Sequence, residues 1–443
     1  MAGSWSGVLE ATRFPNRAMQ VDKAGILGQK IYGGLSEDCL FLNIYSPVDR
    51  GVDLRPVMVW IHGGGFRGGS ANEYDGSVLA PQGNVVVVTL NFRVGAFGHL
   101  DLSGFGQGFE GSASNGFKDM ILALKWIQKN IEDYGGDPAN VTIFGESSGG
   151  SSVLGLLGAP AADGLYHKAI AHSATAAYRE PEDQASKVAE RLNLDVDECL
   201  DHLLAMSGEE IVTLGLPAAI KVDGSVITRS TERAIKERGA AGVPLIAGSN
   251  AREGTLYTEA RDEAQDHYPW LNDYLATDML YGRSPHNYQM ALREKYPDAS
   301  EGKIHEMIWT DMFRKICMEV SQLSALDGPG GWFYRFDLAP TLPETKHFGP
   351  THSSEMAFTF NAFGNPDTHA RIYHDRKDPL VRDLATKWSN TLIQFARTGE
   401  PSGAGLPDWP MYGQSRPCLI LDVASYIAPD PDEEHRSLWL DLD

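Results

Sequence analysis

Cysteine is scarce in this chain of 443 residues, and the four that occur lie far apart in the sequence. Cys39, Cys199, Cys317 and Cys418 show neither the CxxC spacing of a zinc site nor the close framework of a disulfide-rich domain. We therefore expect reduced thiols, no metal and no disulfide scaffold.

Long apolar runs are also missing. None approaches the roughly 18 residues that a membrane-spanning helix needs, so we expect no membrane span. The N-terminal stretch MAGSWSGVLEATRFPNRAMQ lacks the basic region, apolar segment and cleavage site of a signal peptide. This predicts a cytoplasmic protein, with secretion left open if the N-terminus is incomplete.

Internal repeats and low-complexity linkers are absent as well, and we expect residues 1–443 to form a single domain.

Basic residues are outnumbered by acidic ones. The chain has 38 Lys and Arg against 59 Asp and Glu, which gives a formal net charge of −21. This charge would repel a phosphate backbone or an anionic membrane surface, which argues against nucleic acid as a partner.

Strand and helix signals alternate along the chain. Strands are predicted at 41–47, 57–62, 85–92, 243–250 and 331–337, and NVTIFGESSGG (140–150) reads as a strand, a sharp turn and a helix. Residues 119–133 carry apolar groups at close to helical spacing. This alternation predicts a largely parallel sheet covered by helices on both faces. Residues from about 255 to 325 are mostly helical and are predicted to form a cap.

The segment Gly145-Glu146-Ser147-Ser148-Gly149 is the first with chemical meaning. A serine on a tight turn between a strand and a helix needs a strained backbone, and glycines two residues to either side remove side chains that would clash. Such a turn presents the Ser147 hydroxyl at a helix N-terminus, with the Ser148 N–H aimed at a developing oxyanion. Because 47 glycines make a chance GxSxG match common, the flanking strand and helix carry the argument.

A second glycine-rich segment, His62-Gly63-Gly64-Gly65-Phe66, directly follows a predicted strand. Acyl transfer needs several N–H donors that converge on one oxygen, and a glycine run lets the backbone approach without obstruction. We therefore expect Gly64 and Gly65 to be oxyanion donors. A flexible turn is the alternative.

Together these segments resemble the type-B carboxylesterase family, to which cholinesterases and bacterial p-nitrobenzyl esterases belong. The resemblance covers essentially the whole chain, in SEDCLFLN (36–43), VMVWIHGGGF (57–66), NFRVGAFG (91–98), VTIFGESSGG (141–150), GLYHKAIAHS (164–173) and WSNTLIQFARTGEP (388–401). It implies an α/β-hydrolase fold, with a mostly parallel central sheet, helices on both faces and a helical cap. It also implies hydrolysis of a small-molecule carboxylic ester without a cofactor, by a monomer or small homo-oligomer.

The resemblance implies the partners of the serine as well. GSNAREG (248–254) matches the family's GxNxxEG block, which makes Glu253 the acid, although a lone glutamate is more often a solvated surface group. GPTHSSE (349–355) matches the G-x-x-H-x-x-E block, which makes His352 the base. His347 is a rival close in sequence that lacks this spacing. The order serine, acid, histidine is the one expected of this fold.

The predicted site therefore has reacting side chains, backbone donors and supporting side chains. The reacting side chains are Ser147, Glu253 and His352, which would work through an acyl-enzyme intermediate. The oxyanion donors are the N–H groups of Gly64, Gly65 and Ser148. The supporting side chains are Glu146 and Ser173.

Other matching positions are interpreted as structural. Arg93 and Asp119 fall where the family has a buried arginine–aspartate pair, which holds segments in register rather than reacting. The chain also begins later than family members usually do, so a shortened N-terminal edge is expected. In the family a cysteine aligning near Ala18 bonds the cysteine of the EDCL block, so the resemblance implies that Cys39 has no such partner here.

Two other classes of function stay open. A non-catalytic binding protein of this fold would keep the sheet but typically lose the serine, the histidine or the glycine donors, all of which are present here. An amidase, thioesterase or carbamate hydrolase would use the same triad, so the sequence does not separate these enzymes from an esterase.

Overall fold

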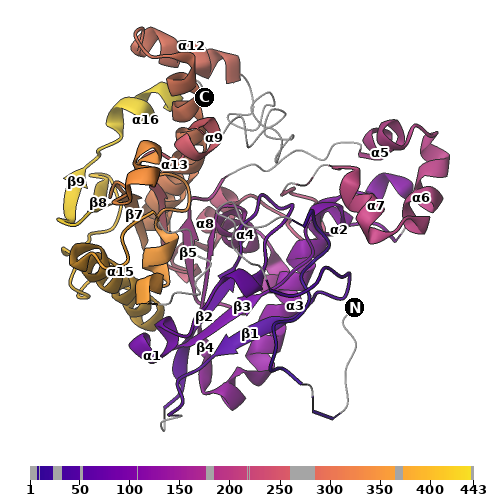
Figure 1. Ribbon diagram of the computed structural model, residues 1–443, viewed down its shortest axis with the longest axis horizontal. Coiled ribbons are helices and arrows are strands. Elements are labelled where there is room, and N and C mark those ends of the chain that lie inside the picture. The colour runs from indigo at the N-terminus through magenta and orange to yellow at the C-terminus, as the bar shows by residue number, and fades with distance from the viewer. Residues whose placement is uncertain are drawn as a thin grey trace. The chain divides into compact units, whose positions relative to one another are not determined.

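The computed structural model describes residues 7, 8, 10–22, 32–49, 53–106, 108–175, 184–216, 218, 220–259, 285–364 and 373–440. These residues divide into two compact units. Within the described ranges, the first unit contains residues up to 167 and 184–234, and the second contains 168–175, 235–364 and 373–440. Each unit has its own strands and helices (Figure 1).

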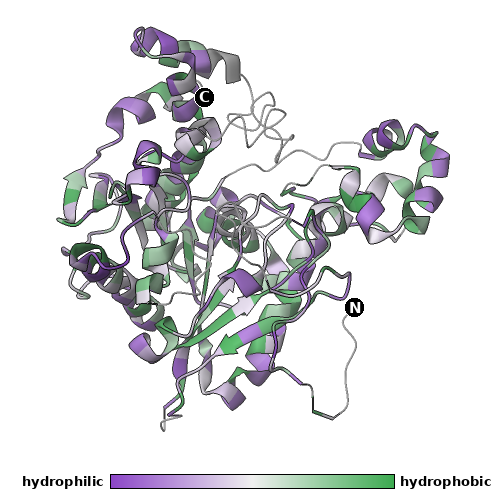
Figure 2. Ribbon diagram, viewed as in Figure 1, coloured by the Kyte–Doolittle hydropathy of each residue, from purple (hydrophilic) through white to green (hydrophobic). Residues whose placement is uncertain are grey.

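The strands of the first unit hydrogen-bond in the order β1-β3-β2-β4. β1 (Leu42–Tyr45) is antiparallel to β3 (Val86–Leu90), whereas β2 (Arg55–Ile61) is parallel to both β3 and β4 (Gly136–Glu146). β3 is buried along its whole length, as predicted for a valine-rich strand covered on both faces, and apolar residues mark much of these strands in Figure 2. Ile61 pairs with Gly145, so the segments after β2 and β4 leave the same edge of the sheet.

Two helices of the first unit fix the segments that matter for the site. The predicted helix at 119–133 is α3 (Asn115–Asn130), continued by a 3₁₀ turn over Ile131–Tyr134. α4 (Ser148–Leu157) follows β4 and is buried throughout. The other helices of this unit are α1 (Leu79–Gly83), α2 (Gly95–His99), α5 (Gln184–Leu192), α6 (Val196–Ala205) and α7 (Gly208–Thr213), and α8 (Thr231–Arg238) begins in this unit and ends in the second.

The predicted pair of Arg93 and Asp119 is present. Arg93 Nε and Nη2 lie 2.7 and 2.8 Å from the two carboxylate oxygens of Asp119, and the Arg93 backbone N–H donates to the same carboxylate at 3.1 Å. Asp119 is buried, whereas the Arg93 side chain is 34% exposed. The pair therefore fastens the segment after β3 to α3, and it is only half-buried.

The strands of the second unit hydrogen-bond in the order β5-β6-β7-β8-β9. β5 (Lys168–His172), β6 (Leu245–Asn250), β7 (Gly331–Phe336) and β8 (Pro417–Leu421) are parallel, and β9 (Tyr426–Pro429) is antiparallel to β8. The parallel strands end along one edge, and the loops that follow them can bring side chains together there.

Helix α13 (Glu301–Asp327) is the longest helix of the second unit, and it packs along β6 and β7. Ser321 Oγ donates to the Trp332 carbonyl at 3.0 Å, and a Cβ at Gly331 would lie 2.0 Å from the Ser321 carbonyl oxygen. The other helices of this unit are α9 (Thr255–Glu259), α12 (Pro285–Lys295), α14 (Met356–Thr359), α15 (Pro379–Thr398) and α16 (Glu433–Leu440).

The region predicted as a cap is helical where the structure describes it, in α9, α12 and α13. Residues 260–284 of that region lie outside the described residues. α13 differs from a lid in that one of its faces covers the sheet.

All four cysteines fall within the described residues, and each is buried and free. Burial raises the pKa of Cys39 and of Cys317 to about 12, so both thiols are protonated at neutral pH. Across the described ranges, no helix is long and apolar enough to cross a membrane.

Candidate active site

Ser147 lies at the sharp turn between β4 and α4. Its φ of 58° and ψ of −127° place it in a region that residues with a side chain rarely adopt. A Cβ at Gly149 would lie 2.1 Å from the Ile61 carbonyl oxygen, and one at Gly145 would lie 2.6 Å from the Gly149 carbonyl. Both flanking positions are therefore restricted to glycine, because the turn packs directly against the end of β2.

Replacing Ser147 by glycine should give a more stable protein than replacing it by alanine. Both changes remove the hydroxyl, but only glycine adopts a φ of 58° without strain. A strained backbone of this kind costs on the order of 1–3 kcal/mol. That exceeds the roughly 0.5–1 kcal/mol by which a flexible glycine destabilises the folded state. Denaturant unfolding of the two variants measures the difference, and an alanine variant of equal or greater stability would contradict strain at this turn.

The glycine run after β2 lies against this turn. Gly64 and Gly65 have φ values of 119° and 64°, and a Cβ at Gly64 would lie 2.2 Å from the Gly68 carbonyl oxygen. A Cβ at Gly63 would lie only 3.1 Å from Ser147 Cβ. Within the described part of the chain, the N–H groups of Gly64 and Gly65 donate no hydrogen bond. They are available to an oxygen beside Ser147.

Ser148 and Glu146 flank the serine in the same unit. Ser148 is the first residue of α4, where the initial N–H groups have no acceptor within the helix. Glu146 is 4% exposed, and its Oε2 lies 3.0 Å from the position of a Cβ at Gly63. The buried carboxylate thus borders the glycine run.

Glu253 and His352 lie together in the second unit. Glu253 stands in the turn after β6, and His352 stands in the loop between β7 and α14. Glu253 Oε2 is 2.5 Å from His352 Nδ1, and the two side chains are 0% and 4% exposed. Because Nδ1 is engaged with the carboxylate, Nε2 is the ring nitrogen left to take a proton from another group.

Aromatic side chains hold the plane of the His352 imidazole. The Phe313 ring lies 4.4 Å from it and the Tyr257 ring 5.5 Å from it, between centroids. His347, the rival histidine, is exposed on the 3₁₀ turn Pro343–Phe348 and packs on Phe348. The described contacts therefore distinguish the two histidines clearly.

Ser173 and Asn250 complete the surroundings of the Glu253 carboxylate. Glu253 Oε1 accepts from Ser173 Oγ at 2.6 Å, from the Asn250 backbone N–H at 2.6 Å and from Asn250 Nδ2 at 3.1 Å. Asn250 Nδ2 also donates to Glu355 Oε2 at 2.7 Å. The carboxylate of Glu253 is thus fixed by three donors besides the imidazole, which preserves its orientation.

Sequence reasoning gave no role to Asn250, Glu355 or Tyr334. Tyr334 OH donates to Glu355 Oε1 at 3.4 Å and lies 2.6 Å from His172 Nδ1. A signal existed for two of these residues, because Asn250 and Glu355 occupy fixed places in the blocks that contain Glu253 and His352. Tyr334 carried none, since it reads as one more apolar residue of β7.

The predicted site residues thus form two groups in the structure. One group belongs to the first unit and comprises Ser147, Ser148, Gly64, Gly65 and Glu146. The other belongs to the second unit and comprises Glu253, His352 and Ser173. Among the described residues, no cluster of histidine, cysteine and carboxylate side chains could hold a metal ion.

Comparison with known proteins gives matches along nearly the whole chain. A family model described as the carboxylesterase family matches residues 1–435. A para-nitrobenzyl esterase of Bacillus subtilis (strain 168) is 36% identical over 98% of this chain and 88% of its own length. The human cocaine esterase is 32% identical over 95% of this chain and 79% of its own length.

Solved structures agree with these sequence matches. A carboxylesterase of Geobacillus stearothermophilus superposes with a TM-score of 0.82 at 31% identity, over 98% of this chain and 91% of that one. A PNB esterase superposes with a TM-score of 0.79 at 32% identity, over 98% and 90% of the two chains. The predicted α/β-hydrolase fold, with its mostly parallel sheet, is confirmed by these neighbours.

Proposed function

This chain belongs to the carboxylesterase family, and on that premise we propose that its carboxylic ester hydrolysis proceeds through a Ser147–His352–Glu253 triad. It is a serine carboxylesterase. The observation that most supports the triad is the buried 2.5 Å hydrogen bond between Glu253 Oε2 and His352 Nδ1. A carboxylate in that position selects the tautomer with an unprotonated Nε2 and stabilises the imidazolium that forms during the reaction.

In the proposed reaction His352 Nε2 takes the hydroxyl proton of Ser147 as the serine oxygen attacks the ester carbonyl carbon. The tetrahedral intermediate collapses to an acyl-enzyme, and the alcohol leaves with the proton from His352. Water then attacks the acyl carbon with the same base, which releases the acid and restores the serine.

The oxyanion of each tetrahedral intermediate is proposed to bind the N–H groups of Gly64, Gly65 and Ser148. Two observations support this assignment. The glycine run packs against Ser147, and the Gly64 and Gly65 N–H groups have no acceptor among the described residues. Donors fixed in advance stabilise the developing charge without reorganisation, which is commonly the largest single contribution to catalysis.

The proposed substrate is a small carboxylic ester. The same triad could in principle cleave an amide, so the leaving group has to be tested directly. Hydrolysis of a p-nitrophenyl ester should be faster by orders of magnitude than that of the p-nitroanilide with the same acyl group. A comparable rate for the anilide would assign the enzyme to amide hydrolysis.

We expect kcat/KM to rise with pH between roughly 5.5 and 7.5 and then to level off. His352 must be neutral to act as a base, and an ordinary histidine has a pKa of about 6.5. Stopped-flow or initial-rate measurements with a neutral p-nitrophenyl ester give the profile. Activity that stayed constant down to about pH 5 would contradict a histidine base.

Four other buried histidines do not contribute to this rise of kcat/KM with pH, which forms the acid limb of the profile. Burial lowers the pKa of His62 to about 4, of His99 to about 3, of His172 to about 3 and of His374 to about 4. They stay neutral through the pH range of the expected rise, so the limb reports on a different histidine.

A further inference from the structure

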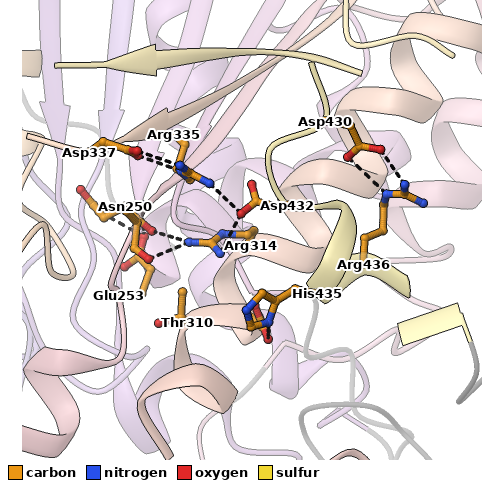
Figure 3. Close-up of polar contacts among 12 residues, drawn as sticks. Asn250, Glu253, Thr310, Arg314, Arg335, Asp337, Asp430, Asp432, His435 and Arg436 are labelled. Carbon is orange, nitrogen blue, oxygen red and sulfur yellow. Dashed lines mark hydrogen bonds and ion pairs between the residues drawn. The ribbon is translucent and has the colours of Figure 1, made fainter. Parts of the chain in front are cut away.

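Arg314 is a buried arginine whose guanidinium faces the turn that carries Glu253. It lies on α13 and is 5% exposed. Arg314 Nη2 donates to the carbonyl oxygen of Ala251 at 2.8 Å and to that of Asn250 at 3.3 Å. Figure 3 shows the guanidinium between this turn and Asp432. An arginine is rarely buried unless its charge is paired and its N–H groups find acceptors, so this placement calls for an explanation.

One of the two carbonyls that Arg314 binds belongs to Asn250, which donates directly to the Glu253 carboxylate. Asn250 donates to Glu253 Oε1 through both its backbone N–H and its side-chain amide. The carbonyl oxygen of Asn250 meanwhile accepts from Arg314. A shift of the Asn250 backbone would therefore disturb the Arg314 contact and the Glu253 contacts together.

α13 contacts the same turn at three successive helical turns. A Cβ at Gly254 would lie 2.0 Å from the Glu306 carbonyl oxygen, and the Gly254 N–H donates to Thr310 Oγ1 at 3.1 Å. Arg314 adds the third contact, and residues four apart share one helix face. One face of α13 thus holds the turn from Ala251 to Gly254 through two charged contacts, the Glu306–Arg252 ion pair at 2.8 and 2.9 Å near one end and Arg314 at the other.

Asp432 fixes Arg314 from the other side. Asp432 precedes α16 and is 3% exposed, and its Oδ1 lies 3.0 Å from Arg314 Nη1 and 2.8 Å from Arg335 Nη1. Arg335 is also paired with both oxygens of Asp337, at 2.8 and 2.7 Å. Two guanidinium groups and two carboxylates therefore balance in charge within this cluster, which Figure 3 draws.

Asp432 is ionised in spite of its burial. Desolvation raises the pKa of its carboxyl, but the adjacent Arg314 and Arg335 outweigh that effect and hold the pKa below its usual value. Arg314 consequently has a permanent counter-ion at neutral pH, and its guanidinium cannot turn away from the carbonyls without breaking that pair.

We propose that Arg314 is a positioning residue for Glu253, which it serves by holding the Asn250–Glu253 turn in place while Asp432 holds Arg314. The inference rests on the proposed function, in which Glu253 orients His352. The described contacts of Arg314 are with the Asn250 and Ala251 carbonyls and Asp432 and not with the imidazole, so its proposed effect passes through the carboxylate.

The test is Arg314→Met, which keeps an unbranched apolar stem but removes the charge and the donors. Misplacement of a catalytic group by about 1 Å costs on the order of 10² in rate, so we expect kcat to fall about 10- to 100-fold, with KM within about threefold. The acid limb of kcat/KM should also move to lower pH, because a displaced carboxylate no longer favours the imidazolium. Initial rates on p-nitrophenyl butyrate across pH, with melting temperatures alongside, measure both effects.

Arg335→Met is the matched control. It removes the other guanidinium on Asp432, from a residue whose described side-chain contacts are with Asp337 and Asp432 and not with the turn. It should lower the melting temperature while kcat and the acid limb stay unchanged. If Arg314→Met behaves in the same way, with reduced stability alone, Arg314 is a structural residue and the proposal is wrong.

Asp432→Asn serves if Arg314→Met does not fold. It keeps an oxygen acceptor for Arg314 and removes only the charge, so kcat should fall less but in the same direction, with the same downward shift of the acid limb. A folded Asp432→Asn enzyme with unaltered kcat and pH profile would overturn the proposal.

Glu253→Gln separates this inference from the function on which it rests. If Glu253→Gln keeps full activity, the triad assignment is wrong. If it is inactive, Arg314→Met should reduce its residual rate no further, because both changes act on one carboxylate. If the combined variant instead loses rate by the product of the two single reductions in kcat, Arg314 acts by another route. In that case only the inference about Arg314 fails.

Discussion

Ser147→Ala should lower kcat by on the order of 10⁴ to 10⁶ while leaving substrate binding nearly intact. The proposed reaction forms a bond from the Ser147 oxygen to the acyl carbon, and alanine offers no nucleophile in its place. The residual rate would come from binding and from the N–H donors of Gly64 and Gly65, which the change leaves in position. Burst kinetics with a p-nitrophenyl ester give a second measure, because the parent should release one equivalent of phenolate rapidly and the variant none.

Ser152→Ala is the control for that experiment. Its hydroxyl is buried in the same helix, α4, and donates to the Ser148 carbonyl oxygen at 2.8 Å, one turn away from the nucleophile. Loss of such a side-chain hydrogen bond within a helix costs about 1 kcal/mol of stability. Its kcat should stay within about tenfold of the parent value. A Ser147→Ala enzyme that kept the burst would disprove the serine mechanism.

The sequence predicted the parts of the fold whose signal is local. The valine run at 85–92 gave β3 (Val86–Leu90) because a strand covered on both faces must be apolar throughout. β5, β8 and β9 were not predicted. β8 is five residues long, and besides the adjacent β9 its partner is β7, some eighty residues earlier in the chain, so part of its stability comes from pairing that no local pattern reveals.

The same contrast between local signals and long-range contacts applies to the candidate site. Glycine at 145 could be foreseen in part, because one clash that it avoids, with the Gly149 carbonyl, lies within one turn of chain. Glycine at 149 instead avoids the Ile61 carbonyl oxygen at the end of β2, a contact that only the fold creates. The burial of Glu253 could not be foreseen either, because its partners Ser173, Asn250 and His352 come from three separate segments. Arg314 gave no signal at all, since an arginine on a helix is usually exposed and its acceptors here are backbone oxygens 63 and 64 residues away in sequence.

His352→Ala should be nearly inactive, with kcat reduced by on the order of 10⁴ to 10⁶, whereas His347→Ala should keep activity within about tenfold. The reason is the difference in surroundings. His352 is buried, bonded to Glu253 and held by the Phe313 ring, while His347 is exposed on a 3₁₀ turn. Because both variants lose an imidazole, His347→Ala is the matched control. An inactive His347→Ala enzyme beside an active His352→Ala enzyme would reassign the base.

The double variant decides whether His352 and Ser147 act as one unit. Members of a serine triad are strongly non-additive, so Ser147→Ala combined with His352→Ala should be hardly slower than either single change. Labelling gives an independent check, since an organophosphate should modify Ser147 rapidly in the parent and slowly in His352→Ala, where no base draws the proton from the hydroxyl. The Glu253 carboxylate keeps its donors from Ser173 and Asn250 in that variant, so slow labelling would reflect loss of the base and not collapse of its surroundings. Rapid labelling of His352→Ala would mean that another group activates Ser147, and the triad would have to be rebuilt around that group.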